Sequence, residues 1–198
     1  GDVYKRQFLK CSPDEDHTEV LKRELAVAAE LGAPRVRSFS WWRAPQPEAV
    51  RPRLLAVLTA ALERARAAGL DLLLENEHLC NVGTGQEAAW YLDRLPELGL
   101  IWDPGNEAML GGRPYPDGYR AVRGRVRHVH VKDVAGGAWA VAGNGVSEWG
   151  SQLRALAADG YDGLLSIETH ISEPSPEAAT RRAVAALRRV GESAGLRL

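Results

Sequence analysis

The hydrophobic positions of the chain repeat at a helical spacing in some segments and form short continuous runs in others. Leucine and alanine recur every three or four residues where helices are predicted, whereas apolar runs bounded by glycine or proline predict strands. The predicted strands cover residues 35–40, 70–74, 99–102, 126–131 and 163–167, with a minor strand at 138–142. The predicted helices cover residues 18–31, 47–68, 84–98, 116–122, 147–160 and 176–190.

Local capping signals indicate where several of these helices begin. Thr84 and Glu87 have the spacing of a capping box, which places a helix start at residue 84. Ser147 is expected to cap the helix that carries Trp149, and Ser175 followed by proline opens the last helix. Helix and strand therefore alternate along the chain, which predicts a parallel sheet covered by helices.

The strand ends decide between an open sheet and a closed barrel. An open doubly wound sheet normally carries a glycine-rich phosphate turn, and the sequence contains neither GxGxxG nor GxxxxGK[ST]. Instead, four successive strands end in a carboxylate or an imidazole. An open sheet would spread these groups over roughly 14 Å, whereas a (β/α)8 barrel gathers all its strand ends around one axis. The sequence therefore predicts an α/β fold of the TIM-barrel class.

The length of the chain predicts an incomplete barrel. A complete barrel needs about 250 residues and eight strands, whereas this chain has 198 residues. We therefore expect about five C-terminal β/α units to be present and roughly three N-terminal strands to be missing. Residues 2–7 back-translate to a transposon end used in preparing sequencing libraries, so we interpret residues 1–7 as an adapter scar, a natural polar segment being the alternative. Residues 8–198 are then the C-terminal part of a single TIM-barrel domain.

Composition and charge exclude several partner classes. Hydrophobic residues make up 45% of the chain and charged residues 26%, which is typical of a globular protein. A formal net charge of -1 gives no reason to expect nucleic acid or an anionic membrane as partner. No apolar run reaches the roughly 18 residues of a membrane span. Cys11 and Cys80 do not form a disulfide framework, so we expect a cytoplasmic protein.

Five short motifs follow one another along the chain: LLLENEH at 72–78, WDPGN at 102–106, HVHVKD at 128–133, GNGVSEW at 143–149 and SIETH at 166–170. In this order they resemble the xylose-isomerase-like superfamily of sugar phosphate isomerases and epimerases, and the resemblance covers nearly everything from Ser12 onward. In that superfamily a Glu, an Asp, a His and a Glu from four consecutive strand ends hold one divalent cation. Carried over by motif, the resemblance implies that these metal ligands are Glu75, Asp103, His130 and Glu168.

The chemistry of this residue set agrees with the implied function. Three carboxylates and one imidazole suit Mn²⁺ or Mg²⁺, with Co²⁺ and Zn²⁺ as alternatives. Such an ion polarises a sugar carbonyl, and positioned carboxylates then move a proton on and off the neighbouring carbon. By resemblance, Glu75 and Glu168 are the catalytic acid/base partners, with Glu77 as an alternative ligand in place of Glu75.

The predicted activity is a metal-dependent isomerase or epimerase that acts on a sugar, a sugar phosphate or a keto-sugar. The expected partner is a small-molecule carbohydrate, and the full-length protein could form a homo-oligomer. An inosose-type dehydratase of the same superfamily is one alternative, and a non-catalytic barrel fragment is another. The zinc apurinic endonucleases share the fold but use more histidines and a basic DNA-facing surface, which five histidines and a net charge of -1 do not supply.

Four further residues are candidates for binding substrate. Asn106 departs from the Asp-x-x-His form common among the epimerases, and it either binds substrate or caps a helix. Lys132 shares a strand face with His130, and it either approaches substrate or pairs with Asp133 or another carboxylate. The remaining two candidates are His78, which like His170 follows a ligand position, and Trp41, which with Trp42 follows the first strand. Loop and barrel-mouth packing roles are the alternatives for these. His128 is expected to be a core histidine.

Overall fold

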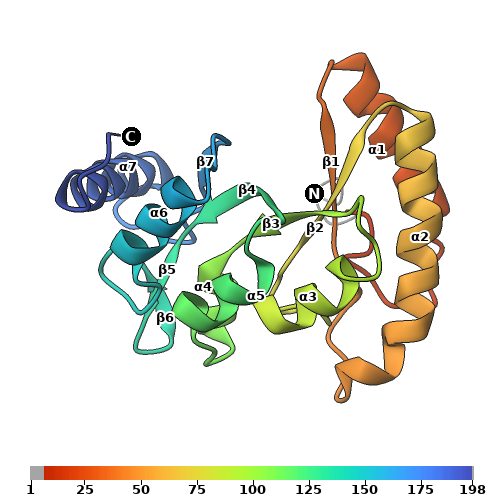
Figure 1. Ribbon diagram of the computed structural model, residues 1–198, viewed down its shortest axis with the longest axis horizontal. Coiled ribbons are helices and arrows are strands. Elements are labelled where there is room, and N and C mark those ends of the chain that lie inside the picture. The colour runs from red at the N-terminus through yellow and green to blue at the C-terminus, as the bar shows by residue number, and fades with distance from the viewer. Residues whose placement is uncertain (1–6, 198) are drawn as a thin grey trace.

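A sheet of parallel strands that curls into an open arc organises the computed structural model, which describes residues 7–197 (Figure 1). Residues 1–6, which fall in the predicted adapter scar, lie outside the described residues. The strands of this sheet lie in the order β1-β2-β3-β4-β7 and comprise β1 (Arg35–Ser38), β2 (Asp71–Glu75), β3 (Gly99–Trp102), β4 (Val126–Val131) and β7 (Leu165–Ile167). A two-stranded antiparallel hairpin, β5 (Asp133–Ala135) and β6 (Ala138–Ala140), follows β4.

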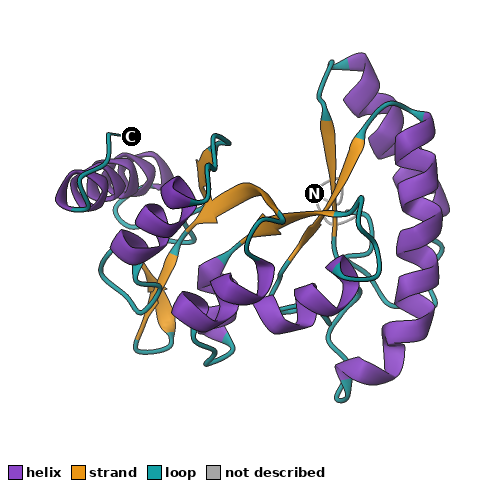
Figure 2. Ribbon diagram, in the orientation of Figure 1, coloured by secondary structure: helices purple, strands orange, loops and turns teal. Residues whose placement is uncertain are grey.

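Helices cover the convex side of the arc and leave its concave side open (Figures 1 and 2). They are α1 (Thr18–Glu30), α2 (Arg51–Ala67), α3 (Gly85–Leu92), α4 (Pro104–Met109), α5 (Tyr119–Val122), α6 (Trp149–Ala158) and α7 (Pro176–Ser193). A short 3₁₀ turn, Pro47–Val50, precedes α2, and a π turn, Pro114–Gly118, precedes α5. None of the described helices is both long and apolar enough to cross a membrane.

The predicted fold class is confirmed: the five parallel strands, flanked by helices, form a curled half-barrel. Every neighbouring pair in the sheet is parallel, with Ser38 beside Leu74, Leu74 beside Leu100, and His130 beside Ser166. Successive side chains of a strand alternate between the two faces of the sheet. One set packs under the helices in the hydrophobic core, and the other set includes the strand-end polar groups that come together.

The third helix is shorter than predicted. The capping box of Thr84 and Glu87 is present, but α3 ends at Leu92 instead of continuing to residue 98. The guanidinium of Arg125 donates hydrogen bonds to the carbonyl oxygens of residues 92, 95, 96 and 98 at 2.7–3.0 Å. Pro96 also lacks the N–H that a continuing helix would use. Arg125, which is distant in sequence, therefore stabilises the end of this helix by hydrogen bonding to the carbonyl group of its last residue and to those of the turn that follows.

Two local details differ from the prediction. Ser147 does not cap α6: the residue before the helix is Glu148, at a φ of 50°, and the Ser147 hydroxyl has no hydrogen-bond partner within the described part of the chain. The helix α4 was not predicted at all, because the Pro-Gly pair at 104–105 resembles a turn. Asp103 caps this helix by accepting a hydrogen bond from the backbone N–H of Asn106, so the cap is Asp103 and not Asn106.

Candidate metal centre

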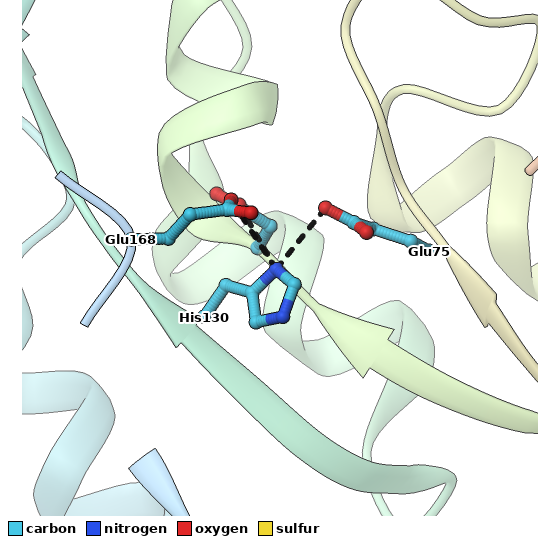
Figure 3. A group of neighbouring side chains, drawn as sticks. Glu75, His130 and Glu168 are labelled. Atoms are coloured by element: carbon cyan, nitrogen blue, oxygen red, sulfur yellow. Dashed lines mark hydrogen bonds and ion pairs between the residues drawn. The ribbon is translucent and has the colours of Figure 1, made fainter. Parts of the chain in front are cut away.

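Four strand ends bring their polar side chains to one point on the concave side of the sheet. Glu75 is the last residue of β2, Asp103 follows β3, His130 lies near the end of β4 and Glu168 follows β7. Each offers one ligand atom, and these four atoms all lie within 4.8 Å of one another. Glu75, His130 and Glu168 point toward one another from separate strands (Figure 3). The structure therefore brings together the four residues that the strand pattern singled out.

His130 lies at the centre of this group. Its Nδ1 atom is 3.1 Å from Oε1 of Glu75, 3.4 Å from Oε2 of Glu168 and 3.8 Å from Oδ2 of Asp103. Glu75 and Asp103 are almost completely buried, at 1% and 0% exposed, whereas the Glu168 side chain is 35% exposed. Glu168 is therefore the carboxylate that a molecule arriving from the open side would meet first.

Two cationic side chains border the group. The Lys132 ammonium lies 2.9 Å from Oδ2 of Asp103 and 2.7 Å from Oε2 of Glu168. The Arg37 guanidinium donates a hydrogen bond to Oε2 of Glu75 at 2.8 Å and lies 3.8 Å from Oε1 of Glu168. Each cation therefore bridges two of the three carboxylates, so both hold the carboxylates at fixed positions around His130.

The protonation of the group follows from burial and these contacts. Complete burial raises the pKa of Asp103 to about 7, because desolvation outweighs the charge of Lys132. Burial alone would lower the pKa of His130, but its contacts with Glu168 and Glu75 outweigh burial and raise it to about 9. Burial would likewise raise the pKa of Glu168, but His130 and Lys132 hold it well below the usual range. At neutral pH, His130 is therefore mostly protonated and Glu168 is ionised.

The residue set fits a small divalent cation. The Oδ2 atom of Asp103 is buried, and the Lys132 ammonium 2.9 Å away balances its charge without a well-directed hydrogen bond. A divalent cation would give this buried oxygen a second positive partner. The four ligand atoms lie within 4.8 Å of one another, which is compatible with the spacing of ligands around a single divalent ion.

The structure distinguishes Glu75 from its alternative, Glu77. Glu77 binds His78 through Oε1 at 2.7 Å and Lys10 through Oε2 at 3.1 Å. Burial by itself raises the pKa of Glu77, but the His78 and Lys10 contacts outweigh it and lower the pKa to about 2. Both oxygens of Glu77 are therefore engaged away from His130, and Glu75 is the glutamate that joins the four-residue group.

Three of the four predicted substrate-binding residues lie beside the group. Asn106 is fully buried and its Oδ1 accepts a hydrogen bond from His78 Nδ1 at 2.9 Å, so the two form one cluster. Lys132 pairs with Asp103 and Glu168, which is the predicted ion pair with another carboxylate and not one with Asp133. Asn106 and Lys132 are buried and therefore form part of the wall of the site.

The fourth, Trp41, is not brought to the site. Its indole is completely buried in the core, 6.0 Å from the His17 ring and under the Arg53 guanidinium. The expectation of a sugar-stacking Trp41 is therefore corrected to a packing role. His128 precedes His130 by two residues on β4 and is half-buried. Its Nε2 pairs with the Ser166 hydroxyl at 2.8 Å.

Two residues near the site were missed in the sequence. Arg37 lies in the predicted strand 35–40, to which no functional residue was assigned. Arg35 and Arg37 share one face of this strand, which indicates that this face is polar. Trp139 lies on β6, with its ring 5.2 Å from the Lys132 ammonium, 5.4 Å from the His78 ring and 4.7 Å from the His170 ring. Only contacts between distant segments place Trp139 there, so no local sequence signal could have found it.

Asp133 fixes the segment that carries Trp139. Its carboxylate accepts four backbone hydrogen bonds, at 2.9–3.0 Å, from Val134, Gly143, Gly145 and Ser147. A side chain at position 145 would not fit, because its Cβ would lie 2.3 Å from the Val134 carbonyl oxygen. Asp133 therefore ties the chain after β4 to the loop before α6.

Comparison with known proteins agrees with this geometry. The sequence model of the xylose isomerase-like TIM barrel family matches residues 8–190. A curated relative, the rhizopine catabolism protein MocC of Rhizobium meliloti, is 29% identical over 77% of this chain. The match covers 56% of that relative, so the chain spans about half of its length.

Solved structures share the fold at low sequence identity. The 3-keto-D-glucoside 4-epimerase YcjR of E. coli superposes with a TM-score of 0.73 at 20% identity, over 91% of this chain and 76% of that one. A xylose isomerase-like TIM barrel protein of Mycobacterium smegmatis in complex with magnesium gives a TM-score of 0.67 at 21% identity, over 88% of this chain and 66% of that one. At these identities the likeness establishes the fold alone.

Proposed function

The chain belongs to the xylose isomerase-like TIM barrel family, and from this premise we propose that it carries the metal-binding and proton-transfer half of a sugar isomerase or epimerase site. The observation that carries the proposal is the four-atom group of Glu75, Asp103, His130 and Glu168, within 4.8 Å, with a buried carboxylate oxygen facing it. The substrate is a small carbohydrate with a carbonyl group, as in the family's sugar isomerases and epimerases.

In this proposal the four residues hold one divalent cation, Mg²⁺ or Mn²⁺. A bound cation polarises a substrate carbonyl and so makes the neighbouring C–H bond more acidic. The magnesium complex of the Mycobacterium smegmatis protein, which has the same fold, supports a hard cation in this fold. Burial of Asp103 and Glu75 supplies the low dielectric in which such a charge acts most strongly.

The chain's own side chains would move the proton. Glu168 is ionised and partly exposed, so its carboxylate would accept the proton from the substrate carbon and become a carboxylic acid. Lys132 keeps this carboxylate oriented. Glu75 lies on the other side of His130, where Arg37 holds it, and in its protonated form it would donate its own proton to the opposite face of the carbon, which leaves Glu75 ionised and Glu168 protonated after one turnover.

The first measurement is a Mn²⁺ titration of the chain by calorimetry, after treatment with a chelator. We expect one ion per chain, and Asp103→Asn should weaken binding by more than the 10- to 100-fold loss typical of changes outside the ligand shell. Glu192→Gln, on the exposed face of α7, is the matched control and should bind Mn²⁺ normally. Equal Mn²⁺ affinity in the wild type and Asp103→Asn would refute the four-residue site.

The second measurement tests proton transfer. A panel of ketoses and cyclitol ketones is incubated with the Mn²⁺-loaded chain in D₂O, and exchange of the C–H next to the carbonyl is followed by NMR. Glu168→Gln should abolish exchange while keeping the fold. Product analysis then separates the activities, because an isomerase or epimerase retains all substrate oxygen atoms, whereas an inosose-type dehydratase releases water. Exchange by Glu168→Gln at the wild-type rate would remove Glu168 from the mechanism.

A further inference from the structure

Three rings from separate segments form an aromatic arc, which we define as His78, Trp139 and His170. The Trp139 ring lies in the middle, edge-on to His78 at 5.4 Å and tilted by 38° against His170 at 4.7 Å. His78 comes from the loop after β2, Trp139 from β6 and His170 from the loop after β7. Because β2 and β7 are separated by β3 and β4 in the sheet, the arc spans most of its curvature.

The arc lies just beyond the candidate ligands, toward the mouth of the half-barrel. His78 follows Glu75 by three residues, and His170 follows Glu168 by two. The Lys132 ammonium connects the candidate ligands with the arc, because it contacts Asp103 and Glu168 and also lies 5.2 Å from the centre of the Trp139 ring. A molecule held at the four-residue group would therefore meet the arc next.

The arc is both accessible and rigidly held. Trp139 is half-buried and His170 is exposed, so neither residue is sealed in the core. The hairpin carrying Trp139 is fixed by the four backbone hydrogen bonds to Asp133. His78 is fixed by Glu77 and Asn106 at 2.7 and 2.9 Å. A rigid aromatic surface next to a polar site binds an amphipathic ligand at little entropic cost.

We infer that Trp139 contacts the substrate and selects a ring-shaped polyol, either a pyranose or a cyclitol, over an open-chain one. A polyol ring presents a contiguous face of C–H groups that packs on a flat indole, whereas an open chain with the same hydroxyl groups has no such face. Hydroxyl groups at the ring edge would reach the imidazoles of the arc. This inference rests on the proposed function, because it uses the four-residue group to hold the polar side of the ligand.

A matched pair of probes tests the inference: myo-inositol, which is a ring, and D-glucitol, which is an open chain with the same number of hydroxyl groups. Their dissociation constants are measured by saturation-transfer NMR on the chain with and without Mg²⁺. The Trp139→Ala change should weaken myo-inositol binding about tenfold and leave D-glucitol binding unchanged. Trp139→Phe should keep most of the affinity, because it keeps an aromatic face. Trp90→Ala, on the outer helix α3, is the control and should change neither constant.

The outcomes separate this inference from the proposed function. Mg²⁺ affinity is measured for each variant. If the wild type fails to bind Mg²⁺, this result counts against the proposed metal site alone, because the dissociation constants of the two probes are also measured without the ion. Equal weakening of both probes in Trp139→Ala would indicate a structural role and overturn the inference. Unchanged myo-inositol binding in that variant, or no myo-inositol binding by the wild type, would overturn it as well.

Discussion

Asp133 makes the clearest energetic prediction of the structure, because one buried carboxylate accepts four backbone hydrogen bonds. Oδ1 accepts from Val134 and Ser147, and Oδ2 accepts from Gly143 and Gly145. The loop that these bonds close also fixes Gln152, whose side chain donates to the Ser147 carbonyl at 2.6 Å and accepts from Trp102 at 2.7 Å. The carboxylate therefore connects β4, α6 and β3.

The change Asp133→Asn keeps the size of the side chain but replaces one oxygen with an N–H₂ group. The amide would orient its oxygen to the fully buried Val134 and Ser147 pair, which leaves its N–H₂ facing the N–H groups of Gly143 and Gly145. Two hydrogen bonds to a charged acceptor are lost, each contributing about 1.5–3 kcal/mol. The two glycine amides are only partly buried and regain some hydration, so we expect a loss of about 3 kcal/mol in the free energy of unfolding.

Urea unfolding followed by circular dichroism measures this loss, with exposed Asp162→Asn as the control for removal of one carboxylate. Hydrogen exchange adds a local readout: the amides of residues 143 and 145 should exchange faster in Asp133→Asn, while those of the distant helix α2 should follow only the global change. A loss below about 1 kcal/mol, or unchanged exchange at these two glycines, would refute the reasoning that these bonds stabilise the loop.

Two further predictions concern Arg37 and the thiols. Arg37→Met leaves the buried Glu75 carboxylate with His130 as its remaining partner, so the free energy of unfolding of the metal-free chain should fall by about 2 kcal/mol. This loss should be smaller at saturating Mn²⁺, and an equal loss with and without Mn²⁺ would contradict a charge effect. Burial raises the pKa of Cys80 to about 12, and burial together with Glu15 raises that of Cys11 to about 11. Both thiols stay protonated as pH rises to 8, so iodoacetamide should modify the native chain far more slowly than the urea-unfolded chain, and equal rates at pH 8 would contradict the structure.

The strands could be predicted from sequence more reliably than the ends of the helices. The continuous apolar run at 99–102 matches β3, because both faces of this strand are buried and its composition reflects it. The strand predicted at 126–131 also matches β4. The end of α3 depends on Arg125, which lies 33 residues after Leu92 and captures its carbonyl. Capping by a distant side chain leaves no periodicity, so pattern alone extended this helix too far.

The position of the candidate ligands could be predicted because a parallel barrel gathers its strand ends by construction. Glu75, Asp103 and Glu168 come together for this reason. Arg37 and Trp139 could not be assigned in the same way, since their contacts depend on side-chain directions between different strands. Trp41 illustrates the opposite error, because an aromatic residue after a strand satisfies the pattern of a binding residue and of a core residue equally well.

The cationic residues around the candidate centre have a consequence for metal exchange. The carboxylates face Arg37, Lys132 and a mostly protonated His130, and Asp103 is itself partly protonated near neutral pH, so the negative charge of the group is largely balanced before any ion arrives. A divalent cation would therefore replace protons of this group instead of filling a charge deficit. Zinc fingers, in contrast, unfold without their ion. We expect this chain to load, release and exchange its metal while folded, with the ion present set by supply in the cell.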